Sequence, residues 1–208
     1  MTRYLRQPLL LTLSIVLLLA VAACSGDRRL QHLGPGAVVL AFGDSITYGT
    51  GASHNASYPV VLEQLIGHKV VNAGIPGEVS TQGLARLPEV LDEAEPDLII
   101  LCLGGNDILR KQSRQALAEN LRQMIQIARD RHIDVVLLGV PEFNLFNHSS
   151  LPLYEEVAKE FDIPYDGDVI PDIEFDRSLK SDPIHPNAEG YRLIAEAVQE
   201  LLEDNGAL

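Results

Sequence analysis

The chain has 208 residues, of which 46% are hydrophobic and 22% are charged, with 29 acidic and 16 basic side chains. This length and composition fit one compact domain with a hydrophobic core, and they exclude a disordered, fibrous or multi-span membrane protein. The net charge of −13 disfavours binding of nucleic acid or of an anionic membrane surface through charge, and the aromatic share of 5% disfavours a platform on which bases or sugars stack.

Residues 1–23 are predicted to be a signal peptide. Arg3 and Arg6 precede an apolar run over residues 9–23, which is short for a bilayer span but fits the hydrophobic region of a secretory signal. Small residues directly before Cys24 resemble the bacterial lipobox, in which the cysteine is lipidated and becomes the new N-terminus. We therefore expect an exported lipoprotein of the bacterial cell envelope, facing the periplasm and bound to the membrane only through Cys24. The alternatives are an ordinary cleaved signal with an incidental cysteine, and an uncleaved anchor.

The rest of the chain is expected to be one folded unit. Residues 24–36 are predicted to be the lipidated cysteine followed by a polar tether, and residues 37–208 the folded domain. The second cysteine, Cys102, lies inside an apolar run and is expected to be a small buried hydrophobe. If Cys24 is lipidated, no disulfide can form within the mature domain.

From residue 37 onward, short apolar runs alternate with longer amphipathic stretches. Runs that are apolar on every position indicate strands buried on both faces, and strand–helix alternation indicates a parallel sheet covered by helices on both sides. The fold class predicted is α/β, a three-layer α/β/α sandwich with about five parallel strands. The expected strands are 37–42, 69–73, 97–103, 133–140 and 163–165, and the expected helices are 58–66, 81–95, 113–131, 153–161 and 188–203.

In such sheets, ligands bind beyond the carboxyl ends of the strands, so reactive residues should follow strands rather than precede them. The sequence fits this rule. Asp44 and Ser45 follow the first predicted strand, Gly74 follows the second, and Asn106 and Asp107 follow the third.

Ser45 is a candidate nucleophile because it stands between a buried strand and a helix. A serine hydroxyl is a weak nucleophile unless a neighbouring base takes its proton. Such a base is available in Asp182-x-x-His185, where a carboxylate three residues away can hold the imidazole in one tautomer. The plainer alternatives are that Ser45 caps the following helix and that Asp182 and His185 form a helix-entry turn.

Acyl transfer also needs hydrogen-bond donors for the negative charge that develops on the carbonyl oxygen. The strand ends offer three: the backbone N–H of Ser45, the backbone N–H of Gly74 and the side-chain amide of Asn106. Each of these residues could equally serve only to form a turn.

These blocks together resemble a known family. Gly43-Asp44-Ser45, Gly74, Gly105-Asn106-Asp107 and Asp182-x-x-His185 occur in the order of the four blocks of the GDSL, or SGNH, hydrolases, which have a flavodoxin-like fold. The stretch from Gly74 to Arg110 resembles the bacterial thioesterase I/protease I/lysophospholipase branch, which includes arylesterases.

The resemblance covers residues 38–204. It implies Ser45 as nucleophile, His185 as base and Asp182 as the residue that orients it. It also implies Ser45, Gly74 and Asn106 as oxyanion donors, with Asp44 and Asp107 in support. The sequence shows no His, Cys or carboxylate cluster at metal-ligand spacing, so we expect neither metal nor cofactor.

The expected substrate is a small-molecule carboxylic ester or thioester of the arylesterase, acyl thioesterase or lysophospholipase type. A carbohydrate or peptidoglycan O-acetylesterase would use the same triad, and a catalytically idle binding lipoprotein is a remote alternative. The segment Val140–His148 departs from the branch pattern, so acyl-chain preference does not carry over. Its apolar members Phe143, Leu145 and Phe146 are candidates for a lid or acyl-binding wall, or for ordinary packing. The sequence leaves the oligomeric state open.

Overall fold

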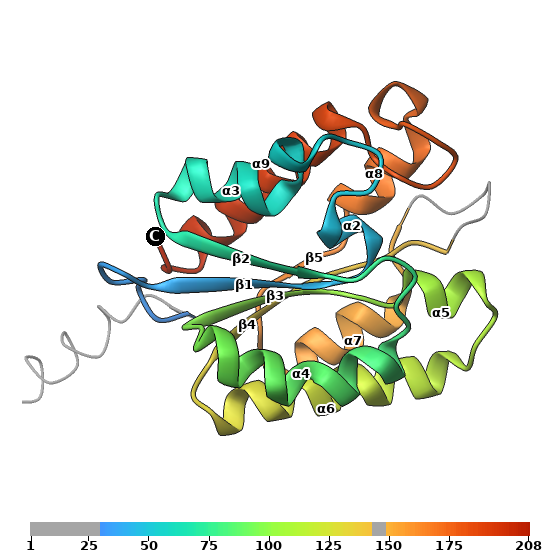
Figure 1. Cartoon of the computed structure of the whole chain (residues 1–208). Coiled ribbons are helices and arrows are strands. Elements are labelled where there is room, and N and C mark those ends of the chain that lie inside the picture. The colour runs from blue at the N-terminus through green and yellow to red at the C-terminus, as the bar shows by residue number, and fades with distance from the viewer. Residues whose placement is uncertain (1–29, 143–148) are drawn as a thin grey trace, which may run out of the picture.

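The computed structural model describes residues 30–142 and 149–208. Its centre is a five-stranded parallel sheet with the strand order β2-β1-β3-β4-β5. The strands are β1 (Val38–Gly43), β2 (Lys69–Gly74), β3 (Leu98–Cys102), β4 (Asp134–Leu138) and β5 (Tyr165–Asp166). Helices cover both faces, which confirms the predicted three-layer α/β/α fold (Figure 1).

One face of the sheet is covered by α3 (Tyr58–Ile66), α8 (Val169–Phe175) and α9 (Ala188–Asp204). The other face is covered by α4 (Ser80–Ala94), α6 (Arg114–Asp130) and α7 (Pro152–Phe161). Two short 3-10 helices, η1 (His54–Ala56) and η2 (Arg177–Leu179), lie in the connections. The strand interiors separate two apolar clusters, one on each side, so the sheet itself is buried.

Helix α6 illustrates why these sequences fold as they do. Ser113 accepts a hydrogen bond from the backbone N–H of Ala116 and so caps the first turn. Leu117, Leu121 and Ile125 recur every fourth residue and are at most 1% exposed, forming the stripe that packs on the sheet.

The predicted tether is shorter than expected at its C-terminal end. Leu30 and Leu33 are only 5% and 6% exposed, and the backbone N–H of Leu33 donates to the carbonyl of Ala207. Burial of two leucines three residues apart makes residues 30–33 part of the domain. Among the residues the structure describes, no helix combines the length and the apolar character that crossing a membrane requires.

Two very short helices begin where strands end. Helix α2 (Ser45–Tyr48) follows β1, and α5 (Gly105–Leu109) follows β3. The register pairs Gly43 of β1 with Gly74 of β2 and with Cys102 of β3, so the carboxyl ends of three strands lie side by side. This brings the segments after β1, β2 and β3 together at one edge of the sheet (Figure 1).

Candidate active site

Ser45 is the first residue of α2, at the carboxyl end of β1, which lies between β2 and β3 in the sheet. The cap of this helix is the preceding residue, because the carboxylate of Asp44 accepts a hydrogen bond of 3.1 Å from the backbone N–H of Ile46. Capping therefore does not occupy the Ser45 side chain. Its hydroxyl instead lies 3.1 Å from Nε2 of His185, across 140 positions of sequence.

A chain of hydrogen bonds continues from His185 to Asp182. Nδ1 of His185 lies 2.8 Å from Oδ2 of Asp182. A carboxylate only accepts hydrogen bonds, so Nδ1 carries the proton and Nε2 is left to accept from the Ser45 hydroxyl. The three side chains thus form the arrangement in which imidazole can take the serine proton.

The Asp182 carboxylate is held in its ionised form. Partial burial works against the charge, but hydrogen bonds from the His185 side chain and from the backbone N–H groups of His185 and Ile184 outweigh it. Together they lower the pKa of Asp182 to about 2. Asp182 therefore orients His185 and also shapes the turn that carries it, whereas the cap of the following helix α9 is Asn187.

The loop after α2 brings the histidine turn to the nucleophile. A Cβ at Gly51 would stand 2.1 Å from Ser181 Oγ and 2.7 Å from the carbonyl of Pro186, so glycine allows this close contact. The hydroxyl of Tyr191 on α9 donates to the carbonyl of Thr50 over 2.6 Å. Neither contact was foreseen from the sequence, although the positive φ of 97° at Gly51 is typical of a glycine in a special position.

Asn106 lies in the first turn of α5, and its amide donates to Oδ2 of Asp44 over 3.2 Å. Burial, the largest influence, raises the pKa of Asp44 to about 6, against the hydrogen bonds from Ile46 and Asn106. An amide nitrogen has two hydrogens, so one of them remains available for a substrate.

Asp107 supports this arrangement from the neighbouring position. It is 3% exposed and accepts from both the backbone N–H of Ser80 (2.8 Å) and the Ser80 hydroxyl (2.6 Å). Ser80 begins α4, so the carboxylate fills the place of a helix cap and meets the positive end of that helix. Asn120 of α6 donates to the same hydroxyl. The turn that holds Asn106 is thereby fixed to two helices.

Gly74 has a different place from the one expected. Its backbone N–H donates to the Asn72 side chain over 3.0 Å and is not free for an oxyanion. A Cβ at Gly74 would stand 2.1 Å from the backbone nitrogen of Tyr48, so this glycine is needed for the close approach of α2 to β2. The sequence pattern did not reveal this hydrogen bond from the Gly74 N–H to the Asn72 side chain.

Gly77 is a backbone donor that the sequence reasoning missed. The N–H of Glu78 bonds the carbonyl of Ile75, and Gly77 has a φ of 79°, so residues 75–78 form a type II turn with Pro-Gly at its centre. Within the described part of the chain, the Gly77 N–H has no acceptor. Arg110, directly after α5, donates to the Gly77 carbonyl and ties this turn to the Asn106 helix.

A serine, an imidazole and a carboxylate in hydrogen-bond sequence, with an amide donor beside them at the carboxyl edge of a parallel sheet, define a serine hydrolase that transfers acyl groups. Residues 41–193 match the GDSL-like Lipase/Acylhydrolase family, and the chain belongs to that family. The protein is a carboxylic ester hydrolase of the GDSL/SGNH type.

Individual relatives agree with this family assignment. The chain is 32% identical over 172 residues to thioesterase 1/protease 1/lysophospholipase L1 of Escherichia coli (strain K12), covering 79% of this chain and 83% of that protein. It is 30% identical over 205 residues to an arylesterase of Vibrio mimicus, covering 92% and 97%. The crystal structure of TesA superposes with a TM-score of 0.73 at 29% identity, covering 81% of this chain and 99% of that one.

Several expected features lie outside the described residues. They are the signal peptide of residues 1–23, the lipidation site Cys24, and the candidate lid residues Phe143, Leu145 and Phe146. Cys102 is described, and at 1% exposure it is the buried side chain that the sequence indicated.

Proposed function

We propose that Ser45 attacks the carbonyl carbon of an ester or thioester while Nε2 of His185 takes its proton. The observation that carries this proposal is the unbroken hydrogen-bond chain from Ser45 through His185 to Asp182, with distances of 3.1 and 2.8 Å. His185 then protonates the leaving group, and water hydrolyses the acyl-Ser45 intermediate with His185 again as the base.

The developing oxyanion would be held by the N–H of Ser45 at the start of α2, for which the described residues offer no acceptor, and by the second amide hydrogen of Asn106. The Gly77 N–H is the third donor that we propose. Gly74 can contribute only after its N–H leaves the Asn72 side chain. The role of Gly74 in this proposal is therefore to let α2 approach β2.

Turnover of a p-nitrophenyl ester tests the assignment. Ser45→Ala and His185→Ala should each lower kcat by at least about 10³-fold in a protein that still unfolds cooperatively. Near-normal hydrolysis by either folded variant would exclude this mechanism. His54→Ala, a change in η1 outside the triad, is the matched control for His185 and should leave kcat unchanged.

We also propose that the acyl group is an apolar chain rather than acetate. Tyr48, Ile75 and Leu109 are 57%, 45% and 42% exposed, and they follow β1, β2 and β3 on the side of the nucleophile. Large apolar side chains exposed in the segments after the same strand ends as the catalytic serine favour binding of a hydrocarbon chain, because its burial removes apolar surface from water.

A chain-length series of p-nitrophenyl esters separates this from deacetylation. We expect kcat/KM to rise with acyl length, and Leu109→Ser and Ile75→Ser to flatten that rise. Leu65→Ser is the control, since Leu65 is 41% exposed but lies in the last turn of α3, at the opposite end of the strands (Figure 1). A sharp preference for acetate would instead support a carbohydrate or peptidoglycan O-acetylesterase.

Finally, we propose that the enzyme is an exported lipoprotein of the cell envelope, facing the periplasm and attached to the membrane through lipidated Cys24. The support is the sequence of residues 1–24, together with the packing of Leu30 and Leu33. Leu30 and Leu33 pack beside the end of α9, at the edge of the sheet opposite Ser45, so the catalytic edge would point away from the anchor. Mass spectrometry of the mature N-terminus tests this: an unmodified N-terminus at another residue would refute it.

A further inference from the structure

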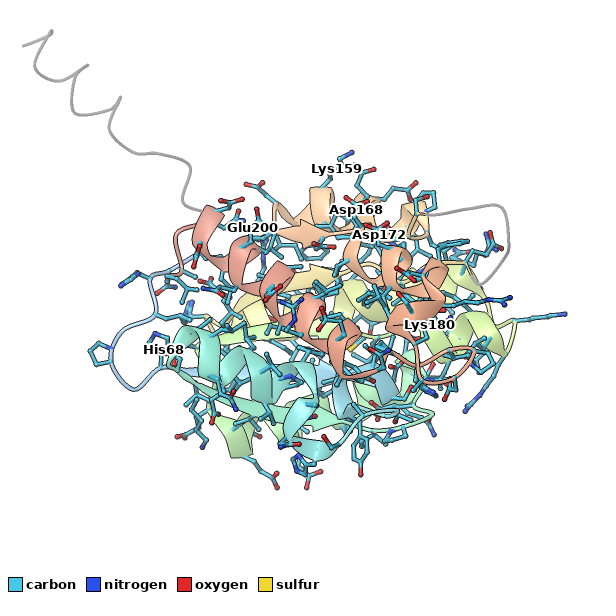
Figure 2. All side chains as sticks on the ribbon, turned by 90° about the horizontal axis from the view of Figure 1, so that it is seen from above. His68, Lys159, Asp168, Asp172, Lys180 and Glu200 are labelled. Carbon is cyan, nitrogen blue, oxygen red and sulfur yellow. The ribbon has the colours of Figure 1, made fainter. Side chains whose placement is uncertain are left out.

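The turn that carries His185 is backed by a buried ion pair. Lys180 precedes the turn, and Glu174 lies in α8; their side chains are only 10% and 8% exposed. Figure 2 shows Lys180 in the segment between α8 and α9. Neither residue belongs to the catalytic chain of hydrogen bonds. Both precede Asp182 in the sequence, and Lys180 contacts the turn that carries His185.

The ammonium group of Lys180 is fully used. Its three N–H donors have three acceptors: Oε2 of Glu174 at 2.7 Å, the backbone carbonyl of Glu174 at 3.1 Å and the backbone carbonyl of Pro183 at 2.6 Å. Pro183 is the first of the two residues between Asp182 and His185 in the Asp-Pro-Ile-His turn. The ammonium therefore connects α8 to the middle of the catalytic turn.

The pair is not arranged for maximum stability. Oε1 of Glu174 is buried and has no hydrogen-bond partner among the described residues. Burial is the main influence on this carboxyl and raises the pKa of Glu174, although Lys180 acts in the opposite direction. A buried ion pair with an unsatisfied oxygen adds little net stability over apolar side chains of the same size, but it does fix geometry. What this pair fixes is the carbonyl of Pro183.

We propose that Lys180, held by Glu174, is a positioning residue for the catalytic turn. By holding the Pro183 carbonyl, it keeps Nε2 of His185 within hydrogen-bond reach of Ser45. This inference rests on the proposed roles of Ser45 and His185. It predicts that loss of the pair lowers kcat while KM changes little, because a displacement of even 1 Å in a reacting group can cost about a hundredfold in rate.

The test separates positioning from stability by removing both charges together. In the double variant Glu174→Leu/Lys180→Met, no charge is left buried alone, so the fold should be retained. Pro183 is an exposed residue, so water can replace the ammonium at its carbonyl. We expect a midpoint of thermal unfolding close to that of the parent protein. We also expect kcat for a p-nitrophenyl ester to fall about 10- to 100-fold, with KM within about twofold.

The rate of Ser45 modification by a fluorophosphonate should fall in the same proportion, since that reaction also needs the His185 base. Lys180→Arg, which keeps the charge and the donors, should recover most of the activity. The control is Lys159→Met on α7, because Lys159 forms an exposed ion pair with Glu155 and should tolerate the same substitution without loss.

A folded double variant with parental kcat would overturn the proposal. If the double variant does not fold, Lys180→Gln decides instead, and parental kcat in that folded variant would overturn it equally. Failure of the triad assignment is distinguishable, because Ser45→Ala would then remain active whatever the outcome at Lys180.

Discussion

Asp44 holds together two parts of the site, and Asp44→Asn should change stability and activity in opposite directions. One carboxylate oxygen accepts from the N–H of Ile46, and the other accepts from the amide of Asn106. Asparagine is as good a helix cap as aspartate, so the first bond can survive. The hydrogen bond from Asn106 cannot survive unchanged. The new side-chain NH₂ group at position 44 would face the NH₂ group of Asn106 unless the Asn106 amide rotates by half a turn.

The effect on stability follows from the pKa of Asp44. Burial raises it from the ordinary 3.8 to about 6, so the folded protein holds this proton more tightly than the unfolded chain does. The stability that the proton supplies is complete below pH 3.8 and is lost as the pH rises through about 6. Each pKa unit corresponds to about 1.4 kcal/mol, so the parent protein should lose about 2–3 kcal/mol from Asp44 between pH 4 and pH 7. Asp44→Asn, which does not titrate, should lose none of it.

The effect on catalysis comes from Asn106. If its amide turns its oxygen toward Asn at position 44, the hydrogen meant for the oxyanion points elsewhere. Loss of one such donor typically lowers kcat by about 10²–10³-fold. The control is Asp97→Asn at the opposite edge of the sheet, where Asp97 accepts from the N–H of Val38 and takes no part in the site.

The assay is urea unfolding of both proteins from pH 4 to pH 7, with ester turnover at pH 7. The difference in unfolding free energy between variant and parent should grow by about 2–3 kcal/mol over that range in favour of the variant, because other titrating groups cancel in the difference. A difference that does not change with pH would refute the burial argument. Unchanged kcat would refute the role of Asp44 in holding Asn106.

Substitutions at three further positions test the architecture of the site. Gly74→Ala should destabilise the fold by at least about 1–3 kcal/mol in urea unfolding, because its Cβ would stand 2.1 Å from the Tyr48 nitrogen. Retained stability would mean that α2 does not approach β2 so closely. Asp107→Ala should cost about 2–4 kcal/mol and lower kcat, since two buried donors of Ser80 lose their acceptor; Asp107→Asn should recover part of the stability. Ser113→Ala should cost about 1 kcal/mol in thermal unfolding with no change in kcat, because it removes only the cap of α6.

Much of the fold could be predicted from the sequence because the strands are apolar on nearly every position. The run Leu98–Cys102 is buried throughout, as expected for a strand in the middle of a parallel sheet. The predicted strands and long helices agree with the observed ones to within a few residues. Helices α5 and α8 were missed because five to seven residues are too few to show a helical period.

Part of the site could likewise be predicted from the sequence, and part could not. Ser45, Asp182, His185 and Asn106 follow from blocks of sequence and from the rule that reactive groups lie beyond strand ends, and the structure brings them together. The place of Gly74 could not be predicted, because its N–H is taken by the side chain of Asn72, a contact that depends on rotamer and local backbone. The pair of Lys180 and Glu174 was equally invisible, since nothing in the sequence distinguishes a buried ion pair from two exposed charges.

Covalent labelling of the nucleophile, the residue that would carry the acyl group, tests the central claim most directly. The protein would be treated with a fluorophosphonate and the modified residue located by peptide mass spectrometry, in the parent and in the Ser45→Ala and His185→Ala variants. We expect a single adduct on Ser45 in the parent, none in Ser45→Ala, and labelling slowed by at least about 10³-fold in His185→Ala. An adduct on another residue, or Ser45→Ala hydrolysing esters at the parental rate, would contradict the account.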